Sequence, residues 1–313
     1  MISGTALIAT VYQEGKGVRP WLDALAAQSD APEEFVIVDG GSTDDTVAQI
    51  TNYAWPAGFP KPRVIVQRCN IAVGRNLAIR NTAASILICT DAGSFPDPNW
   101  LRELARPFLE DPTLDAVGGQ SFATTETDFQ KFLRIFESGY DQPQAVGGDF
   151  SSSRNVAFRR EAWAGVGGYP EWLTLAAEDA LFNFQLRAAG KKLFINPQAI
   201  VRWEERPTAE AFFKLLYRNG FGAAEAQLYA PYFLRRFLIT IFPPLLLLSP
   251  HRFAHLGFRY RRHLSSTLGW LAGKLRGHRP PKDWKKIEGI LLSPEAQRTR
   301  SRQRTRTGSP STC

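Results

Sequence analysis

The sequence predicts an α/β protein built on an open, doubly wound sheet with helices on both faces. Four short apolar runs, rich in β-branched residues, read as buried parallel strands: residues 6–11, 35–39, 63–67 and 86–90. Helical patterns alternate with these runs, at residues 18–28, 43–52, 75–82 and 98–109. In such β-α-β-α sheets ligands gather at the carboxyl ends of the strands. We therefore expect the chemistry of the protein at those ends.

Local signals mark where the helices begin. Ser42 and Asp45 stand in a capping-box-like spacing at the start of the second helix. Pro98 suits the first turn of the fourth helix, because the N–H groups of a first turn have no partner within the helix.

Composition and cysteine usage indicate a folded protein of a reducing compartment. The 313 residues are 44% hydrophobic and 12% aromatic, which is enough for a substantial core. Cys69, Cys89 and Cys313 are odd in number and scattered, without the spacing of a metal site or a disulfide framework. The first residues have no basic segment and no cleavage site typical of a secretory signal. We therefore expect a cytosolic location.

Charge is distributed unevenly along the chain. Residues 231–313 hold 17 Lys+Arg and 3 Asp+Glu, whereas residues 1–230 hold 21 Lys+Arg and 27 Asp+Glu. An acidic body with a strongly basic last quarter indicates that this quarter meets a polyanionic surface, either anionic lipid or nucleic acid.

Two aspartates end two of the predicted strands. The second strand ends in VIVDGGSTDDT, with Asp39 as its last residue, and the fourth ends in ILICTDAGS, with Asp91 in the matching position. Either aspartate alone is equally well explained as a turn residue, but two at equivalent strand ends favour a function. The chain has no G-x-G-x-x-G after its first strand and no G-x-x-x-x-G-K-[ST]. A dinucleotide fold and a P-loop are therefore poorly supported.

Five segments together carry a family resemblance. In order they are VIVDGGSTDDT, CNIAVGRNLAIRNT, CTDAGSFPDPNWL, SSSRNVAFRREAWAGVGGYPEW and AEDALFNFQLRAAGKKL. They resemble the successive signatures of family 2 glycosyltransferases with a GT-A fold, and they span roughly residues 1–220. The resemblance implies a mixed Rossmann-like sheet. It also implies transfer of a sugar from a nucleotide-diphosphate sugar, with inversion at the anomeric carbon.

The resemblance also implies residues that bind the donor. Asp39 matches the aspartate that contacts the nucleoside, a role that suits a hydrogen-bond acceptor. Gly74, Arg75 and Asn76 match a segment that lines the same pocket, with glycine in place of alanine. Arg75 is then expected to reach phosphate, the alternative being an exposed arginine at a helix start.

The metal site implied by the resemblance is incomplete. Asp91 matches the first aspartate of a D-x-D motif that holds ribose and a divalent metal ion, but Gly93 stands in the second position. A histidine often found after the next strand is replaced by Trp203. Three interpretations stay open. Mg²⁺ or Mn²⁺ is held by Asp91, phosphates and water, which we favour; an arginine such as Arg202 or Arg154 replaces the metal charge; or the protein is not catalytic.

The acid–base candidate comes from the fifth segment. Asp179 matches the aspartate that takes the proton from the acceptor hydroxyl, and Glu178 is expected to align it or to touch the acceptor. The alternative is that both acids only favour the positive end of a helix dipole. Arg154 and Asn155, in the preceding segment, are expected to contact sugar or phosphate.

The sequence predicts three regions. Residues 1–230 are expected to form the catalytic domain, with a nucleotide-binding half over 1–110 and an acceptor half over 111–230. Residues 231–292 are expected to form an apolar and basic helical region that associates with a membrane. Residues 293–313, an arginine-rich low-complexity stretch, are predicted to be disordered.

The most apolar run is FLITIFPPLLLL, residues 237–248. It is shorter than the roughly 20 residues that a spanning helix needs, and it contains two prolines. Its basic flanks favour a segment that lies on anionic lipid. The alternatives are a helix packed on the catalytic domain and two short membrane passages made together with residues 264–271. Nucleic acid is a less favoured partner, because no known binding motif accompanies the basic tail.

These expectations combine into one hypothesis: a membrane-associated inverting glycosyltransferase on the cytoplasmic face, peripheral or monotopic. It would move a hexosyl or related sugar to a lipid-linked or polysaccharide-type acceptor. One alternative is a non-catalytic adaptor that binds nucleotide sugar or glycan at the membrane, as Gly93 and Trp203 suggest. A nucleotidyltransferase ranks third, because only Gly15, Lys16 and Gly17 resemble its glycine-rich loop.

Overall fold

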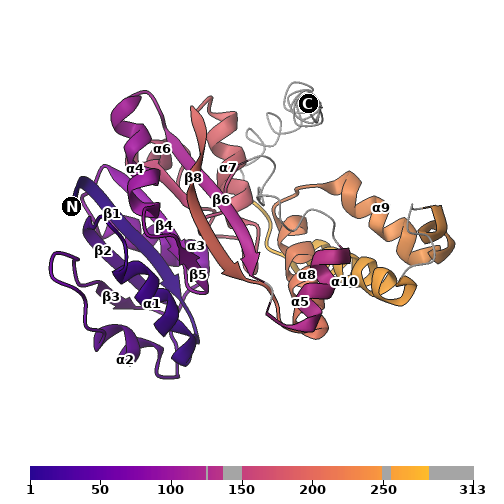
Figure 1. Cartoon of the computed structure of the whole chain (residues 1–313). Coiled ribbons are helices and arrows are strands. Elements are labelled where there is room, and N and C mark those ends of the chain that lie inside the picture. Colours follow the sequence, from indigo (N-terminus) through magenta and orange to yellow (C-terminus); the bar gives the residue numbers. More distant parts are fainter. Residues whose placement is uncertain (125, 137–149, 249–254, 282–313) are drawn as a thin grey trace, which may run out of the picture.

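A single mixed sheet forms the centre of the protein. The computed structural model describes residues 1–124, 126–136, 150–248 and 255–281. Its eight strands follow the order β3-β2-β1-β4-β7-β6-β8-β5, with helices on both faces (Figure 1). The predicted α/β fold class, a mixed sheet covered on both sides, is confirmed.

The first four strands are parallel, as predicted. They are β1 (Ile2–Val11), β2 (Pro32–Asp39), β3 (Arg63–Val66) and β4 (Ile86–Asp91). Strand β1 lies between β2 and β4, and near its end Val11 pairs with Asp39 on one side while Thr10 pairs with Asp91 on the other. The two strand-end aspartates therefore lie at one edge of the sheet, on either side of β1.

The helices between these strands differ from the predictions at their starts. They are α1 (Val18–Ala26), α2 (Thr46–Thr51), α3 (Ile71–Arg80) and α4 (Trp100–Glu110). Helix α3 begins earlier than predicted, because Asn70 accepts a hydrogen bond from the Val73 N–H and caps it. Pro98 precedes α4 instead of starting it. Arg75 consequently lies in the middle of a helix.

The predicted capping box at Ser42 and Asp45 is wrong. The Ser42 hydroxyl donates to Asp39, and Asp45 makes no side-chain cap at the start of α2. Asp44 accepts from the Thr46 N–H and hydroxyl in its place. A hydrogen bond to a buried carboxylate is stronger than one at a helix start, so the Ser42 hydroxyl bonds to Asp39 and not to the start of α2.

Successive side chains of β1 point to opposite faces of the sheet, where they belong to two separate layers of the core. Leu7 and Ala9 face the layer that contains α1 and α4, with Trp21 and Trp100 as its largest buried side chains. Ala6 and Ile8 face the opposite layer, which contains α3, α6 and α7. A strand buried on both faces needs apolar residues at every position, which is why this run lacks an alternating pattern.

The second half of the sheet is largely antiparallel. Its strands are β5 (Ser94–Pro96), β6 (Ala116–Thr124), β7 (Val156–Arg159) and β8 (Leu193–Glu204). Strand β7 runs antiparallel to β4 and β6, and β5 runs antiparallel to β8. Helices α5 (Asp128–Phe136), α6 (Arg160–Gly165) and α7 (Glu178–Ala188) belong to this half. Because β7 is antiparallel to β4, its first residue, Val156, pairs with Cys89 near the end of β4.

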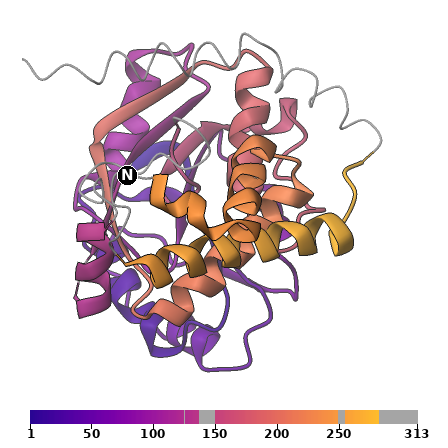
Figure 2. The same ribbon diagram turned by 90° about the vertical axis from the view of Figure 1, so that its right-hand side faces the viewer.

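The C-terminal helices form a group beside the sheet (Figures 1 and 2). They are α8 (Ala209–Glu225), α9 (Ala230–Ile241), the 3-10 helix η2 (Pro243–Leu248) and α10 (Leu256–Arg276). Helices α8 and α10 touch backbone to backbone, since a Cβ atom on Gly220 would lie 2.3 Å from the Ser266 carbonyl oxygen. The most apolar run of the sequence, residues 237–248, contains the end of α9 and the whole of η2.

In the predicted membrane region most of the described residues are helical, in α9, η2 and α10, whereas residues 242, 255 and 277–281 are not. No helix within the described ranges is both long enough and apolar enough to span a bilayer. The predicted disordered tail, residues 293–313, and the last part of the preceding region, residues 282–292, lie outside the described residues.

Candidate active site

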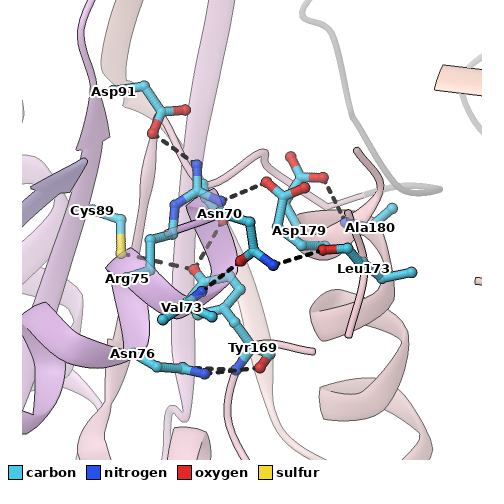
Figure 3. A network of polar contacts seen from close by, with 12 residues as sticks. Asn70, Val73, Arg75, Asn76, Cys89, Asp91, Tyr169, Leu173, Asp179 and Ala180 are labelled. Carbon is cyan, nitrogen blue, oxygen red and sulfur yellow. Dashed lines mark hydrogen bonds and ion pairs between the residues drawn. The ribbon is translucent and has the colours of Figure 1, made fainter. Parts of the chain in front are cut away.

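A buried arginine joins three distant segments at the carboxyl edge of the sheet. Arg75, on α3, donates from Nη2 to Asp91 Oδ1 at 2.7 Å (Figure 3) and from Nη1 to Glu178 Oε1 at 2.6 Å. Its guanidinium also lies over the ring of Tyr169, 5.4 Å from the centroid. The end of β4 and the start of α7 are therefore held together through one side chain of α3, and the alternative of an exposed arginine at a helix start is wrong.

Local contacts position Arg75 and its helix. Asn70, the cap of α3, donates from its amide to the carbonyl oxygens of Glu171 and Leu173, which lie just before α7 (Figure 3). Burial by itself would lower the pKa of Arg75, but the charges of Asp91 and Glu178 raise it well above its ordinary value. Arg75 is thus a permanent cation at the centre of this network.

The two acids at the start of α7 have different environments. Glu178 is buried, and burial, followed by the neighbouring charge of Asp179, raises its pKa, while Arg75 acts in the opposite direction. Asp179 is half-buried, and its Oδ1 accepts a hydrogen bond from the Ala180 N–H at 2.7 Å. Its other oxygen accepts no hydrogen bond from the described residues. Of the two acids, Asp179 is the one that a substrate can reach.

The turn before α7 is strained and is supported from behind. Ala177 has a φ of +75°, a left-handed conformation that residues other than glycine rarely adopt. Glu225, buried on α8, accepts from both the N–H and the hydroxyl of Thr174. Helix α8 also touches this turn directly, because a Cβ atom on Gly222 would lie 2.3 Å from the Ala176 carbonyl oxygen. The C-terminal helices thus hold the turn that presents Asp179.

Asp39 is used by its own turn. The side chain is 0% exposed, and its Oδ2 accepts from the Gly41 and Ser42 N–H groups at 3.0 and 2.8 Å. Its Oδ1 accepts from the Ser42 hydroxyl. The contacts of Asp39 are therefore those of a turn residue, and its contact with a nucleoside stays a prediction.

The two predicted asparagines hold the framework. Asn76 donates to the Tyr169 carbonyl and to Glu171, and accepts from the Trp163 indole and the Tyr169 N–H. Asn155 donates to the carbonyls of Gln120 and Ala199 and accepts from the Trp100 indole. Each polar atom of both amides has a partner among the described residues, so the two side chains orient neighbouring segments, and their contact with a ligand stays a prediction.

Arg154 is placed differently from both asparagines. Its guanidinium stacks on Trp203, with its carbon 4.4 Å from the ring centroid. Burial lowers the pKa of Arg154, while the charges of Asp91, Asp179 and Glu205 act in the opposite direction. Arg154 therefore interacts electrostatically with Asp91 and Asp179, although no salt bridge joins it to either.

Two protein-family models match this chain. The glycosyl transferase family 2 model matches residues 6–165, which is half of the chain, and a glycosyl transferase family group 2 model matches residues 86–273. The chain belongs to glycosyltransferase family 2.

Relatives of this glycosyltransferase include two enzymes from Salmonella. The O-antigen chain rhamnosyltransferase RfbN of Salmonella typhimurium is 26% identical over 226 residues, covering 68% of this chain and 70% of the relative. The O-antigen chain rhamnosyltransferase WbaN of Salmonella anatum is 26% identical over 227 residues, with the same coverage.

Solved structures share the fold of this glycosyltransferase. The mannosyltransferase PcManGT of Pyrobaculum calidifontis, in complex with GDP-Man and Mn²⁺, matches with a TM-score of 0.52 and 21% identity, covering 95% of this chain and 83% of its own. TarS of S. aureus, in complex with UDP-GlcNAc, matches with a TM-score of 0.52 and 17% identity, covering 86% and 79%. These likenesses confirm the GT-A type of fold.

The side chains around Asp91 in this family 2 glycosyltransferase do not form a ready metal-binding site. Asp91 Oδ1 is taken by Arg75, and Gly93 provides no ligand and has a φ of +76°. Among the described residues there is no group of three His, Cys, Asp or Glu side chains that could hold a metal ion. The divalent ion predicted at Asp91 stays a prediction that these residues do not favour.

Sequence reasoning missed Glu14 at this site. It follows β1 in the loop that leads to the 3-10 helix η1 (Gly15–Gly17), and its N–H donates to the Thr46 hydroxyl. Burial raises the pKa of Glu14, and the charge of Asp91 adds to the effect. The signal that points to Glu14 is its position after the first strand, because the carboxyl ends of β1, β2 and β4 meet at one edge.

Proposed function

We propose that this family 2 glycosyltransferase moves a sugar from a nucleotide-diphosphate sugar to an acceptor hydroxyl with inversion, and that Asp179 is its general base. The proposal rests on one observation above all. Asp179 is half-buried, with one oxygen that accepts no hydrogen bond from the described residues, directly beside a Glu178 that is buried and bound to Arg75. A rigid neighbour and a reachable carboxylate are what a positioned base requires.

The reaction assigns a distinct role to each side chain. Asp179 takes the proton of the acceptor hydroxyl while that oxygen attacks the anomeric carbon. The bond between this carbon and the diphosphate oxygen breaks on the opposite side, so the configuration inverts and the nucleoside diphosphate leaves. Asp91, fixed by Arg75, orients the donor ribose, and Glu178 positions Asp179 through the start of α7.

The relatives support a proposal for the substrate class. Two of them are O-antigen chain rhamnosyltransferases. This supports a rhamnosyl or related hexosyl group as the sugar that this protein transfers, and a growing lipid-linked or polysaccharide chain as the acceptor. The protein would then act in the assembly of a surface polysaccharide.

The test is donor turnover in the purified full chain. A panel of UDP-, GDP- and dTDP-sugars, including a nucleotide-diphosphate rhamnose, is offered with a lipid-linked rhamnosyl or hexosyl acceptor, and the anomeric configuration of the product is read by NMR. Asp179→Asn is expected to lose about a hundredfold to ten-thousandfold in transfer rate. The matched control is Asp128→Asn, since Asp128 is fully exposed on α5.

The possible outcomes separate the candidate functions. Transfer that survives in Asp179→Asn would assign the base elsewhere, and retention of configuration would contradict the proposed step. Donor binding without turnover in the wild-type protein would favour the adaptor. Release of pyrophosphate from a nucleoside triphosphate would favour the nucleotidyltransferase.

We propose further that the C-terminal helices dock on anionic lipid at the cytoplasmic face of a membrane. Apolar side chains are exposed along one side of α9 and into η2, while Phe233 and Ile239 on the other side of α9 are buried. The exposed members are Leu234, Leu238, Ile241, Phe242 and Leu247. Residues 231–281 contain nine Lys+Arg and no Asp or Glu. An apolar stripe within a purely basic region is complementary to an anionic bilayer surface.

Vesicle flotation tests the docking surface. The wild-type protein is expected to float with phosphatidylglycerol vesicles more than with phosphatidylcholine vesicles. The double variant Leu238→Glu and Ile241→Glu is expected to stay in solution. Leu109→Glu is the control, because Leu109 is similarly apolar and exposed but lies on α4, in another part of the fold. Equal flotation of both variants would overturn the docking surface.

A further inference from the structure

The turn that follows β4 is bordered by a cation on an aromatic platform. Ser94 pairs with Trp203 where β5 meets β8, and the Glu204 N–H donates to the Gly93 carbonyl oxygen at 3.2 Å. The guanidinium of Arg154 stacks on that same Trp203 ring. A positive charge therefore lies next to the turn in which Gly93 occupies the place of a second carboxylate.

The bonding of Arg154 contrasts with that of Arg75. Arg75 has a carboxylate on each of two nitrogens, whereas Arg154 makes no salt bridge with any of the described residues. The Nε atom of Arg154 is buried and has no hydrogen-bond partner in the part of the chain that the structure describes. A buried N–H group without a hydrogen bond is costly, and a bound ligand can supply the missing acceptor.

The ligand that fits is a diphosphate. Guanidinium groups bind phosphate oxygens in a bidentate manner, and stacking on an aromatic ring leaves the edge of the guanidinium free to do so. Gly93 lies two residues after Asp91, and its carbonyl oxygen is hydrogen-bonded to the residue that follows Trp203, so the cation on Trp203 lies near the turn after the proposed donor-binding carboxylate. In the proposed reaction the leaving group is bound at that end of the sheet.

We propose that Arg154, held by Trp203, binds the diphosphate of the nucleotide sugar and is its resident counter-charge. The proposal rests on the nucleotide-sugar function proposed above and adds to it the group that stabilises the leaving diphosphate. The solved relative with GDP-Man contains Mn²⁺. Among the described residues of this chain, no group of three His, Cys, Asp or Glu side chains could hold a metal ion, and a guanidinium lies beside the turn that contains Gly93.

The experiment is a titration of the full chain by calorimetry, in EDTA, with UDP, GDP and dTDP and with their nucleoside monophosphates. The wild-type protein is expected to bind one of the diphosphates more tightly than its monophosphate. Arg154→Gln is expected to weaken diphosphate binding about tenfold to a hundredfold and to remove this preference. Arg154→Lys is expected to retain part of it, and Trp203→Leu to weaken it less than Arg154→Gln.

The control is Arg202→Gln. Arg202 precedes Trp203 on β8 and points to the other face of the strand, where it pairs with Asp97 at 3.5 Å. Its substitution is expected to leave diphosphate binding unchanged. Binding of the monophosphate by Arg154→Gln shows that this variant is folded and that its nucleoside pocket is intact.

Several results would overturn the inference, and they differ from failure of the proposed function. If Arg154→Gln prefers the diphosphate as strongly as the wild type does, the counter-charge is not Arg154. If wild-type binding vanishes in EDTA and returns with Mn²⁺, a metal ion supplies the charge. If the wild type binds none of the nucleotides with or without Mn²⁺, the proposed nucleotide-sugar function itself fails.

Discussion

Two turns at the same edge of the sheet begin with the same residue type and differ in what that residue can still bind. Asp39 ends β2 and is fully buried, with both carboxylate oxygens accepting hydrogen bonds from its own turn. Asp91 ends β4, and its side chain is 25% exposed and bound on one oxygen by Arg75. The first turn is closed on itself, and the second belongs to a network that reaches three segments.

The residues that follow each aspartate explain why only Asp91 keeps an oxygen for a ligand. After Asp39 the chain continues with Gly40, Gly41 and Ser42, whose N–H and hydroxyl groups turn back to the carboxylate. After Asp91 no side chain or N–H of the following turn reaches it among the described residues, so Arg75 is its partner. A carboxylate that is saturated by its own turn stabilises that turn, whereas one with a free oxygen can bind a substrate.

The largest effect is expected from removing the cation of the open network. Arg75→Gln leaves Asp91 and the buried Glu178 without a counter-charge, which is expected to cost about 3–5 kcal/mol of unfolding free energy. Urea denaturation measures it. The control is Arg80→Gln on the same helix, whose salt bridge with Glu171 is exposed and is expected to contribute about 0–1 kcal/mol. Equal losses in both variants would remove Arg75 from the centre of the network.

The second largest effect is expected from replacing Asp39 and Asp91 in turn, and it compares their roles in stability and activity. Asp39→Ala deprives two N–H groups and a hydroxyl of their acceptor and is expected to lower the unfolding free energy by about 2–4 kcal/mol. Asp91→Asn keeps an acceptor for Arg75 and is expected to lose less stability but most of the transfer activity. Chemical denaturation and donor turnover are measured on both variants. The reverse pattern would show that Asp39 is the more functional of the two.

A smaller effect concerns pH and the buried member of the network. The pKa of Glu178 is raised in the folded protein above its ordinary value of 4.5, chiefly by burial. The stability that its proton contributes is present below that ordinary value and is lost as the pH rises through the raised pKa. Relative to wild type, the melting temperature of Glu178→Gln should therefore improve from about pH 4 to about pH 7. Glu33→Gln, at an exposed site, is the control, and a constant difference would contradict the pKa shift.

The smallest effect is expected from restoring the second carboxylate. Gly93 has a φ of +76° and a Cβ atom there would meet nothing within 4 Å, so Gly93→Asp should fold at a cost of about 1 kcal/mol. With two carboxylates at the turn, nucleoside diphosphate binding should gain a dependence on Mn²⁺ that the wild type lacks. Gly58→Asp is the matched control, because Gly58 has a φ of +86° and open space and lies in the loop between α2 and β3. Absence of any gain would place the turn away from the diphosphate.

The sequence predicted the fold more completely than the contacts of the site. Strands β1 to β4 were evident because runs buried on both faces must be apolar throughout. Their alternation with helices placed Asp39 and Asp91 at one edge, and the register on either side of β1 confirms this. The start of α3 and the capping-box prediction failed, since Asn70 and Asp39 take hydrogen bonds that spacing alone assigned to other residues.

The contacts of the site join residues that are far apart in the chain. Arg75 meets Glu178 across 103 positions, and Glu225 supports Thr174 across 51. No local pattern reports such pairs, because each residue taken alone reads as an ordinary helix residue. Arg154 on Trp203 is a contact of the same kind, and the pairing of Trp203 with Ser94 places it beside the Gly93 turn.

By itself the amino-acid sequence determined the α/β class, the sheet edge where the strand-end acids gather, and the motifs that place the chain in its family. Those properties depend on the periodicity of apolar residues and on short motifs, both of which are local. Only the tertiary structure decided which carboxylates are saturated and which are free, and which arginine is bound between carboxylates and which lies beside an incomplete turn. Burial and hydrogen-bond partners set these properties, and both depend on segments that the fold brings together from distant parts of the chain.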